Sequence, residues 1–453
     1  MNIENNKIKL IQINSIIFLI FIKIKGNSNM KKRVLILSCG SLAATDMNMS
    51  LKDNEEFEIF GSSVYKNHGV YVYKNYISDI PQIKDENFIK ILNEKIAEYN
   101  IKFLVCTHED ICLYLQANDK KINAIIVHSN YDTALLCRYK SKTYEKMKKY
   151  DFVPKIFQKE EVKEFPVFVK KDTDQGARNA YKVQNQEQLE FYTSKLEMLI
   201  CEYLPGEEVT VDCFTNKDHK LLFCNPRASD RMLAGIDVHA RRIELSEEIK
   251  YIAESLNKEI EFRGFWFFQI KKDINGKFKL LEISTRMPGA FSLSRCLDVN
   301  LLEMALKDFD GQDVDLTFND INIEADKQFF GKYALSIEYD EIYIDFKTCF
   351  ESLNNINPLV MLYLYQCSNK NIKINLLTEN TNNTLKYLEE NKIAKSLFKE
   401  IIEISRNEIK DVLKEKSILL SNDDNLKNEI RKKNKNYCCF SNNIIEALID
   451  WRS

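Results

Sequence analysis

The chain has 453 residues, of which 45% are hydrophobic and 29% are charged, and its formal net charge is -2. This length is enough for roughly two to four domains, and the balanced charge excludes the basic surface typical of proteins that bind nucleic acid. The 12 cysteines include no C-x-x-C pair, which favours reduced thiols in a cytoplasmic protein over a disulfide framework or a zinc site.

The first 29 residues are interpreted as an extension that precedes the natural start of the protein. Their apolar run, 16–22, is far shorter than the ~20 residues that a membrane-spanning helix needs, so no membrane partner is expected. At Met30 a basic triplet leads into a second apolar run, 34–37, which is typical of the first strand of an α/β protein.

A Rossmann-like domain is predicted over residues 30–127. Apolar residues recur at helical spacing in 88–99, between short apolar runs that predict strands. Alternating strands and helices favour a parallel, doubly wound sheet. No G-x-G occurs in the chain, so this domain is expected to have no phosphate loop of its own. The predicted strands are 34–37, 57–61, 103–106 and 124–127.

Two further domains are predicted. Residues 128–335 are α+β in character, with a helix at 143–150 and a β-hairpin whose turn contains Gly276. The predicted strands of this domain are 167–170, 199–202, 208–212, 265–270 and 279–283. Residues 336–453 read as a separate α/β domain with strands at 341–345, 372–378 and 417–421. The fold class is therefore multidomain α/β and α+β.

Charged and amide side chains gather at the strand ends of the middle domain. Cations there can neutralise phosphates, and carboxylate or amide oxygens can hold Mg²⁺. Gln269 lies among aromatic residues, where its amide needs partners, because leaving it unpaired on burial costs ~1–3 kcal/mol. These residues are Lys142, Lys170, Glu202, Glu208, Gln269 and Glu282.

The order and spacing of these residues over 30–335 resemble the ATP-grasp superfamily, and most of all its carbamoyl-phosphate-synthase-like carboxylate–amine ligases. The most specific match is E-Y-L-P-G-E-E at 202–208, and E-I-S-T-R at 282–286 resembles the family pattern E-x-N-x-R. The other matching segments are R-Y-K-S-K-T at 138–143, P-V-F-V-K at 166–170 and Pro226-Arg227 with Arg231 and Gly235.

The resemblance implies a site for ATP and Mg²⁺, with Mn²⁺ as an alternative ion. Lys142 and Lys170 would be the nucleotide lysines, and Gly176 would belong to the loop over the phosphates. Glu202, Tyr203 and Leu204 would border the adenine, and Glu208 would bind the ribose hydroxyls. Gln269, Glu282 and Ser284 would be the metal positions, and Arg231 and Arg286 would lie beside the transferred phosphate.

Two departures from the family pattern stand out. Ser284 replaces the asparagine ligand, and a hydroxyl is a poorer ligand for Mg²⁺ than an amide carbonyl, so the second metal is expected to be weaker or bridged by water. The phosphate loop at 172–178 keeps only Gly176, so fewer backbone NH groups can approach the phosphates closely.

The implied activity is that of a ligase that activates a carboxylate as an acyl phosphate for attack by an amine. Its partners would be a small-molecule carboxylate and a small-molecule amine, in a homodimer. A nucleotide-binding regulatory or scaffold protein is the alternative.

The last domain resembles the haloacid-dehalogenase-like phosphatases. Asp345 matches the nucleophile, Thr378 the second-motif hydroxyl, and Asp423 the metal-binding acid. Lys347 stands where the general acid/base would be, and losing that group removes ~10²–10⁴-fold in rate. The domain is therefore expected to be catalytically inactive, with a residual phosphatase as the alternative.

Overall fold

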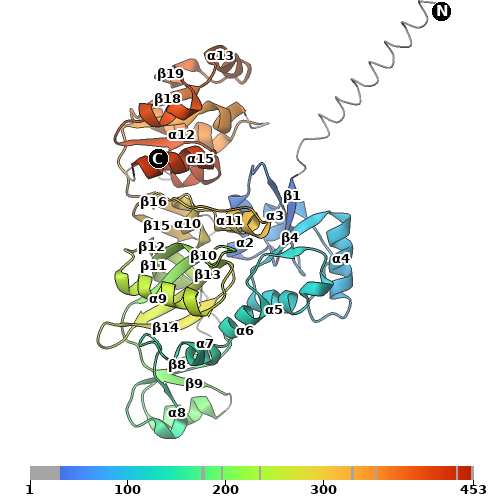
Figure 1. Ribbon diagram of the computed structural model, residues 1–453, viewed down its shortest axis with the longest axis vertical. Coiled ribbons are helices and arrows are strands. Elements are labelled where there is room, and N and C mark those ends of the chain that lie inside the picture. Colours follow the sequence, from blue (N-terminus) through green and yellow to red (C-terminus); the bar gives the residue numbers. More distant parts are fainter. Residues whose placement is uncertain are drawn as a thin grey trace, which may run out of the picture.

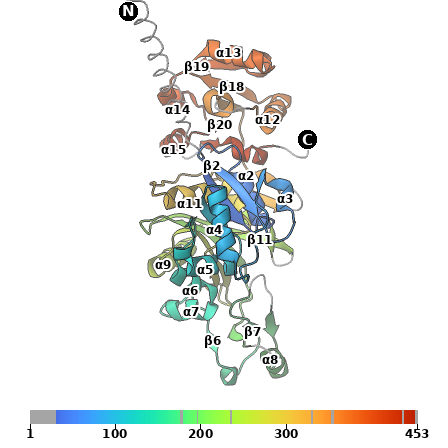
Figure 2. The same cartoon turned by 90° about the vertical axis from the view of Figure 1, so that its right-hand side faces the viewer.

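The computed structural model describes residues 31–174, 179–194, 197–233, 236–327, 331–351, 355–434 and 437–449. Within them the chain forms four β-sheets. Figure 1 shows the sheet of the last domain at one end of the molecule and a small sheet with helix α8 at the other. The first domain packs beside the large central sheet, and Figure 2 shows it in front of that sheet after a turn of 90°. The upstream extension and Gly176 lie outside the described residues.

The first domain is a five-stranded sheet in the order β3-β2-β1-β4-β5, and its paired strands are parallel. Alternate residues of β1 enter different cores, because side chains of a strand point to opposite faces: Val34 and Ile36 join one cluster, and Leu35 and Leu37 join another. The strands are β1 (Lys32–Leu37), β2 (Phe57–Ser62), β3 (Asn75–Tyr76), β4 (Ile101–Cys106) and β5 (Ile125–Ile126). The helices are α2 (Leu42–Ser50), α3 (Gly69–Val72), α4 (Phe88–Glu98) and α5 (Glu109–Ala117).

Two helices, α6 (Tyr131–Arg138) and α7 (Lys140–Met147), lead from this domain into a small antiparallel sheet of order β6-β9-β7-β8. Asn130 begins α6 by accepting a hydrogen bond from the Thr133 backbone. Helix α7 begins three residues before the helix predicted at 143–150. The other elements are β6 (Ile156–Phe157), β7 (Val167–Lys170), β8 (Ala180–Val183), α8 (Gln186–Thr193) and β9 (Leu199–Glu202).

The central sheet has seven antiparallel strands in the order β14-β13-β10-β11-β12-β15-β16. The predicted hairpin is present, and Gln269 of β13 pairs with Glu282 of β14. Gly276 has φ +78 in the turn, where a side chain would be strained. The strands are β10 (Glu208–Thr215), β11 (Leu221–Leu233), β12 (Ile236–Arg242), β13 (Gly264–Lys272), β14 (Phe278–Ser284), β15 (Ile323–Lys327) and β16 (Gly331–Leu335). The helices are α9 (Glu247–Glu259), α10 (Phe291–Cys296) and α11 (Leu301–Phe309).

The last sheet is parallel, with order β19-β18-β17-β20-β21. The residues on one face of this sheet, such as Ile342 and Leu376, share a hydrophobic cluster with β1, α2, α10 and α11, so this core runs through three domains. Residues on the other face, such as Tyr343 and Leu419, form a separate cluster. The strands are β17 (Glu341–Asp345), β18 (Lys373–Thr378), β19 (Glu400–Glu403), β20 (Ser417–Leu420) and β21 (Cys438–Phe440). The helices are α12 (Pro358–Asn369), α13 (Thr381–Glu390), α14 (Ile409–Val412), α15 (Asp424–Lys433), a π-helical turn at Lys347–Glu351 and the 3₁₀ segment η6 (Asn442–Ala447).

The cysteines depart from expectation at one place. Cys106 at the end of β4 and Cys112 in α5 form a disulfide, because the turn between these elements brings their Cα atoms to 6.0 Å. The other cysteines are free thiols. Among the residues that the structure describes, no helix is both long enough and apolar enough to cross a bilayer.

Candidate functional site

Lys170 is a buried lysine at the end of β7, facing the edge of the central sheet. Its ammonium donates to the Tyr144 hydroxyl at 2.8 Å and to the Leu281 carbonyl at 3.1 Å. The Tyr144 hydroxyl also donates to Leu281, at 2.6 Å. Burial lowers the pKa of Lys170 from its usual value, because desolvation disfavours the charged form. The small sheet thus places a buried ammonium group against strand β14.

Glu282 lies opposite Gln269 on the hairpin, so both side chains belong to one face of the sheet. Its carboxylate forms an ion pair with Lys140 at 3.0 Å. The Gln269 amide donates weakly to the Thr210 hydroxyl, at 3.4 Å. The amide carbonyl and the carboxylate are oxygen donors of the kind that a hard divalent cation prefers.

Helix α7 presents Lys140 to this group of residues, whereas Lys142 lies on an exposed face. The Lys142 ammonium lies 4.4 Å from the Tyr139 ring centre. Lys140 is buried, and its ammonium also donates to the carbonyl of Asp174 at 2.9 Å. The motif match selected Lys142, two residues away. The position of the first helical turn, which decides between the two lysines, is not readable from the motif.

Ser284 and Arg286, at the end of β14, meet a residue of the first domain that the sequence analysis did not select. The Ser284 hydroxyl donates to Glu109 at 2.6 Å, and the Arg286 guanidinium lies 3.6 Å from the same carboxylate. Glu109 is the first residue of α5, three positions after Cys106, which ends β4. The sequence holds one signal for Glu109: it follows the carboxyl end of a parallel strand, and ligands of parallel sheets bind at the edge that these strand ends form.

The segment 202–208 connects the small sheet to the central sheet. The Glu202 carboxylate accepts from the Lys155 backbone at 2.8 Å, and Leu204 is buried. The Tyr203 ring lies 4.2 Å from the Lys182 ammonium. The Glu208 carboxylate pairs with Lys271 at 3.2 Å. These residues lead from β9 into β10, and Glu202 pairs with Val167 of β7, whereas Lys170 pairs with Leu199.

Arg231 is separated from this group. It lies on β11, and its half-exposed guanidinium pairs with Asp326 of β15. No contact of the described residues joins Arg231 to Glu282 or Lys170. Gly176 and Gly235 lie outside the described residues. The structure therefore brings together Lys170, Gln269, Glu282, Ser284 and Arg286, with Lys140 and Glu109 added.

The donor set of this group suits a hard cation such as Mg²⁺, which needs oxygen ligands and takes several of them from a phosphate. Gln269, Glu282 and Ser284 offer an amide, a carboxylate and a hydroxyl on β13 and β14. Within the described residues, no group of three or more His, Cys, Asp or Glu side chains could hold a metal ion by itself.

A second polar centre lies at the carboxyl ends of the parallel strands in the last domain. Asp345, at the end of β17, accepts from Thr348 at 2.8 Å and from Ser421 at 2.7 Å. Thr378, at the end of β18, is buried and accepts a hydrogen bond from Thr384 at 2.7 Å. The ammonium of Lys347 lies 3.5 Å from Glu379.

Arg406 bridges the two acids of this second centre. Its guanidinium lies 3.1 Å from Asp345 and 2.7 Å from Asp423. Burial lowers the pKa of Arg406, but the two carboxylates outweigh this and raise it overall. A fixed monovalent cation thus stands between the carboxylates that the phosphatase resemblance assigns to catalysis and metal binding.

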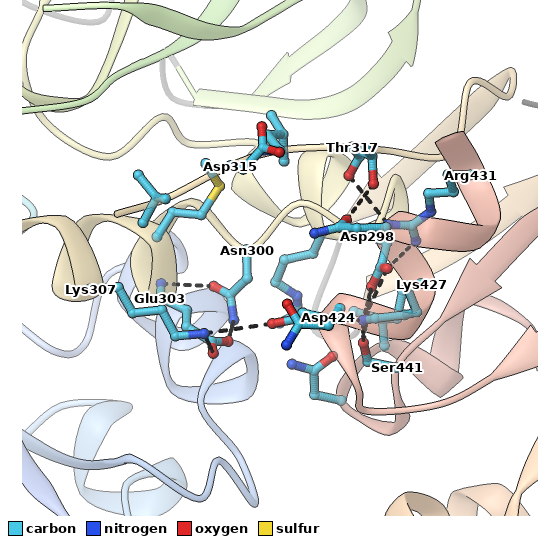
Figure 3. Close-up of a pocket in the computed structure, with 18 of the residues that line it drawn as sticks. Asp298, Asn300, Glu303, Lys307, Asp315, Thr317, Asp424, Lys427, Arg431 and Ser441 are labelled. Atoms are coloured by element: carbon cyan, nitrogen blue, oxygen red, sulfur yellow. Dashed lines mark hydrogen bonds and ion pairs between the residues drawn. The ribbon is translucent and has the colours of Figure 1, made fainter. Parts of the chain in front are cut away.

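A cavity of about 260 Å³ lies where the last domain meets α10 and α11. Figure 3 shows that its charged side chains point toward one another across the domain boundary. The Asp298 carboxylate forms an ion pair with Lys427 at 3.1 Å and accepts a hydrogen bond from the Ser441 hydroxyl at 3.0 Å. It also forms an ion pair with Arg431. These ion pairs, with that of Lys307 and Asp424 at 3.6 Å, join the segment around α11 to α15 of the last domain.

Comparison with known proteins bears on the middle of the chain. The family described as ATP-grasp in the biosynthetic pathway with Ter operon matches residues 194–329. No curated protein matches. These findings, with the structural likenesses below, support an ATP-grasp domain in this chain.

Several solved structures share the fold. Biotin carboxylase from Campylobacter jejuni, in complex with β-γ-ATP, has a TM-score of 0.55 at 15% identity, over 66% of this chain and 76% of its own. N5-carboxyaminoimidazole synthetase from Staphylococcus aureus, complexed with ADP, has a TM-score of 0.55 at 15% identity, over 66% of this chain and 84% of its own. L-amino acid ligase from Bacillus licheniformis has a TM-score of 0.52 at 12% identity, over 65% of this chain and 79% of its own.

Proposed function

We propose that the protein is an ATP- and Mg²⁺-dependent ligase that joins a small-molecule carboxylate to an amine. The observation that carries this proposal is the convergence of Lys170, Lys140, Gln269 and Glu282 at the junction of the small and central sheets. Cations for phosphates and oxygen ligands for a metal meet there, in a domain supported as ATP-grasp. The similar solved structures include a carboxylase in complex with β-γ-ATP, a synthetase complexed with ADP and an amino acid ligase.

The reaction would proceed in two steps. A carboxylate oxygen attacks the γ-phosphorus of ATP, so that an acyl phosphate forms and ADP leaves. The amine then attacks the carbonyl carbon, phosphate leaves, and the amine loses a proton as the C–N bond forms. The protein would contribute alignment and charge neutralisation rather than a covalent intermediate of its own.

The residues of the site would divide these tasks. Lys170, held by Tyr144 and the Leu281 carbonyl, would meet the α- and β-phosphates from the small sheet. Gln269 and Glu282 would hold Mg²⁺, which supplies Lewis acidity to the phosphate oxygens. Arg286 would steady the transferred group. The assignments of Lys142 and Arg231 to the nucleotide remain predictions.

Lys140 would act as the counter-ion of Glu282 when no metal is bound. The buried ammonium and the partly buried carboxylate neutralise each other at 3.0 Å. A divalent cation on Glu282 would compete for the same carboxylate and leave the ammonium free to contact a phosphate oxygen. Lys140 is therefore a better candidate than Lys142 for the first nucleotide lysine.

The last domain would serve docking rather than phosphatase chemistry. Arg406 neutralises Asp345 and Asp423, the residues that the resemblance assigns to the nucleophile and the metal. The position of the general acid/base is Lys347, which pairs with Glu379. A nucleotide-binding scaffold is the alternative function for the whole chain. The neutralised acids of the last domain favour it, and so does Ser284 in the middle domain, which replaces a metal ligand of the family pattern.

The test is a thermal-shift titration with ATP and Mg²⁺ on wild type, Glu282→Ala and Glu254→Ala. Glu254 is an exposed glutamate of α9 and provides the matched control. A ligand at ~100 times its Kd stabilises the fold by about 2.7 kcal/mol. A Mg²⁺-dependent shift that Glu282→Ala alone abolishes supports the site. Acid–amine pairs are then screened for ADP release; binding without turnover for any pair would favour the scaffold, and no shift with ATP would refute nucleotide binding.

A further inference from the structure

Two free thiols face each other across neighbouring strands of the central sheet. Cys213 of β10 and Cys224 of β11 are directly opposite in the antiparallel register. Both side chains belong to the hydrophobic cluster that also contains Ile252 and Leu256 of α9. Thr210, which contacts the Gln269 amide, is three residues before Cys213 and therefore points to the other face of the sheet. The thiol pair and the proposed nucleotide site thus lie on opposite faces.

The backbone of Pro226 shows that the two thiols occupy a non-hydrogen-bonded pair. The Pro226 carbonyl accepts from the backbone of Ile243, which follows β12, so the polar backbone groups of Pro226 point toward β12. Cys224, two residues earlier on the same strand, directs its backbone the same way and away from Cys213. The Cα atoms of such a pair lie about 4.5 Å apart, and their side chains are closer than in a hydrogen-bonded pair. This spacing is within the ~4.4–6.8 Å that a disulfide requires.

The two thiols differ in their access to solvent. Cys213 is 0% exposed, whereas Cys224 is partly exposed. Burial, followed by the hydrogen bond and the charge of the neighbouring Cys224 thiol, raises the pKa of Cys213 well above its usual value. A buried thiol of this kind is a poor nucleophile, because the thiolate is the reactive form. Cys224 is therefore the thiol that an oxidant can reach, and Cys213 lies in contact with it.

We propose that Cys213 and Cys224 form a reversible redox site, which a peroxide oxidises to a cross-strand disulfide and a dithiol reduces. With hydrogen peroxide, the Cys224 sulfur attacks one oxygen, the O–O bond breaks, and a sulfenic acid forms while hydroxide leaves with the proton of the Cys224 thiol as water. The Cys213 sulfur then attacks the sulfenic sulfur, the S–S bond forms, and the hydroxyl leaves with the proton of the Cys213 thiol as water. The two sulfurs lose two electrons, which the peroxide gains. A dithiol reverses the step by exchange and becomes a disulfide itself.

The new disulfide would tie β10 to β11 beside a buried tryptophan. Trp266 of β13 lies directly opposite Cys213 on the other side of β10 and is 0% exposed. Its indole donates to the Thr215 hydroxyl at 2.9 Å. A disulfide close to an indole quenches its fluorescence, because the disulfide accepts an electron from the excited ring. The chain has two tryptophans, so Trp451→Phe leaves Trp266 as the reporter.

The test is oxidation of the full-length Trp451→Phe protein with hydrogen peroxide, followed by alkylation of free thiols and mass spectrometry of the digested protein. We expect a new linked peptide that joins Cys213 to Cys224 and a loss of Trp266 fluorescence, and dithiothreitol should reverse both. Cys224→Ser in the same background should show neither change. Cys367→Ser is the matched control, because it removes a buried thiol of α12, and it should show both changes.

Peptide mapping of the wild-type protein keeps the test independent of how well the variants fold. Alkylation of both Cys213 and Cys224 after peroxide treatment would overturn the inference, as would a sulfinic acid at Cys224 with Cys213 still alkylated. A fluorescence loss of the same size in Cys224→Ser would also overturn it. The Cys106–Cys112 disulfide gives a different peptide and does not affect this result. The test uses no nucleotide, so failure of the redox site is distinct from failure of the proposed function.

Discussion

The ion cluster at the domain boundary predicts a large loss of stability from one substitution, Asp298→Asn. Asp298 is 6% exposed as a side chain, Lys427 3% and Arg431 4%, so the carboxylate and both cations are buried. Its backbone has φ +65, a conformation that asparagine tolerates and alanine resists. Asn at this position therefore removes the charge with little change in shape or backbone strain.

The expected magnitude follows from the loss of the carboxylate that pairs with buried Arg431, whereas Lys427 keeps an ion pair with Asp424 at 3.0 Å. Breaking a buried ion pair by removing one partner costs about 3–5 kcal/mol. Asp315→Asn is the matched control, because Asp315 is 70% exposed and pairs with Lys432 at 3.0 Å. An exposed pair of this kind contributes about 0–1 kcal/mol.

The assay is urea unfolding followed by far-ultraviolet circular dichroism, with limited proteolysis of the folded proteins in parallel. Asp298→Asn should unfold at lower urea and expose the junction between α11 and the last domain to protease, whereas Asp315→Asn should resemble wild type. If both variants unfold at the same urea concentration as wild type, the ion cluster does not hold the domains together and the reasoning is refuted.

Three other outcomes are expected. Lys170→Met should weaken the binding of a fluorescent ATP analogue by roughly 10- to 100-fold without unfolding the protein, because a hydrogen bond to a charged group contributes about 1.5–3 kcal/mol. Unchanged affinity for the analogue would contradict the phosphate-binding role of Lys170. Arg406→Ala, made in a Glu282→Ala background, should gain a Mg²⁺-dependent rise in melting temperature that the background lacks, since two carboxylates lose their cation. Burial lowers the pKa of His128 from 6.5 to about 4. Between these pH values the unfolded chain binds a proton that the folded chain does not, so the free energy of unfolding should fall as the pH drops from 6.5 to 4. His128→Gln should reduce this pH dependence in urea unfolding, and an imidazole that titrates near 6.5 by NMR in the folded protein would contradict the prediction.

The features that sequence analysis predicted well depend on local patterns. Apolar runs such as 34–37 and 103–106 are strands of the first sheet. The turn around Gly276 sets the register as far as Ile270 and Leu280, and a bulge in β14 then brings Glu282 opposite Gln269. In both places the signal lies within about ten residues, where strand periodicity and turn chemistry decide the structure.

The features that sequence analysis did not find depend on contacts between distant segments. Glu109 reaches Ser284 across 175 residues, and Arg406 reaches Asp345 across 61. No periodicity or spacing encodes such pairings. Lys140 was missed for a different reason: the helix begins at that residue, and helix boundaries are the least readable part of a sequence.

The hydrophobic cluster that runs through three domains has a consequence for how the protein is made. It contains Val34 and Met47 from the start of the first domain together with Ile444 and Ile449, and Asn443 donates to the Ser50 carbonyl at 3.1 Å. A ribosome must therefore translate about 400 further codons before β1 and α2 find all their packing partners. The nascent first domain leaves the exit tunnel with apolar surface uncovered, and chaperones that shield such surface during translation should associate with it until the last domain arrives.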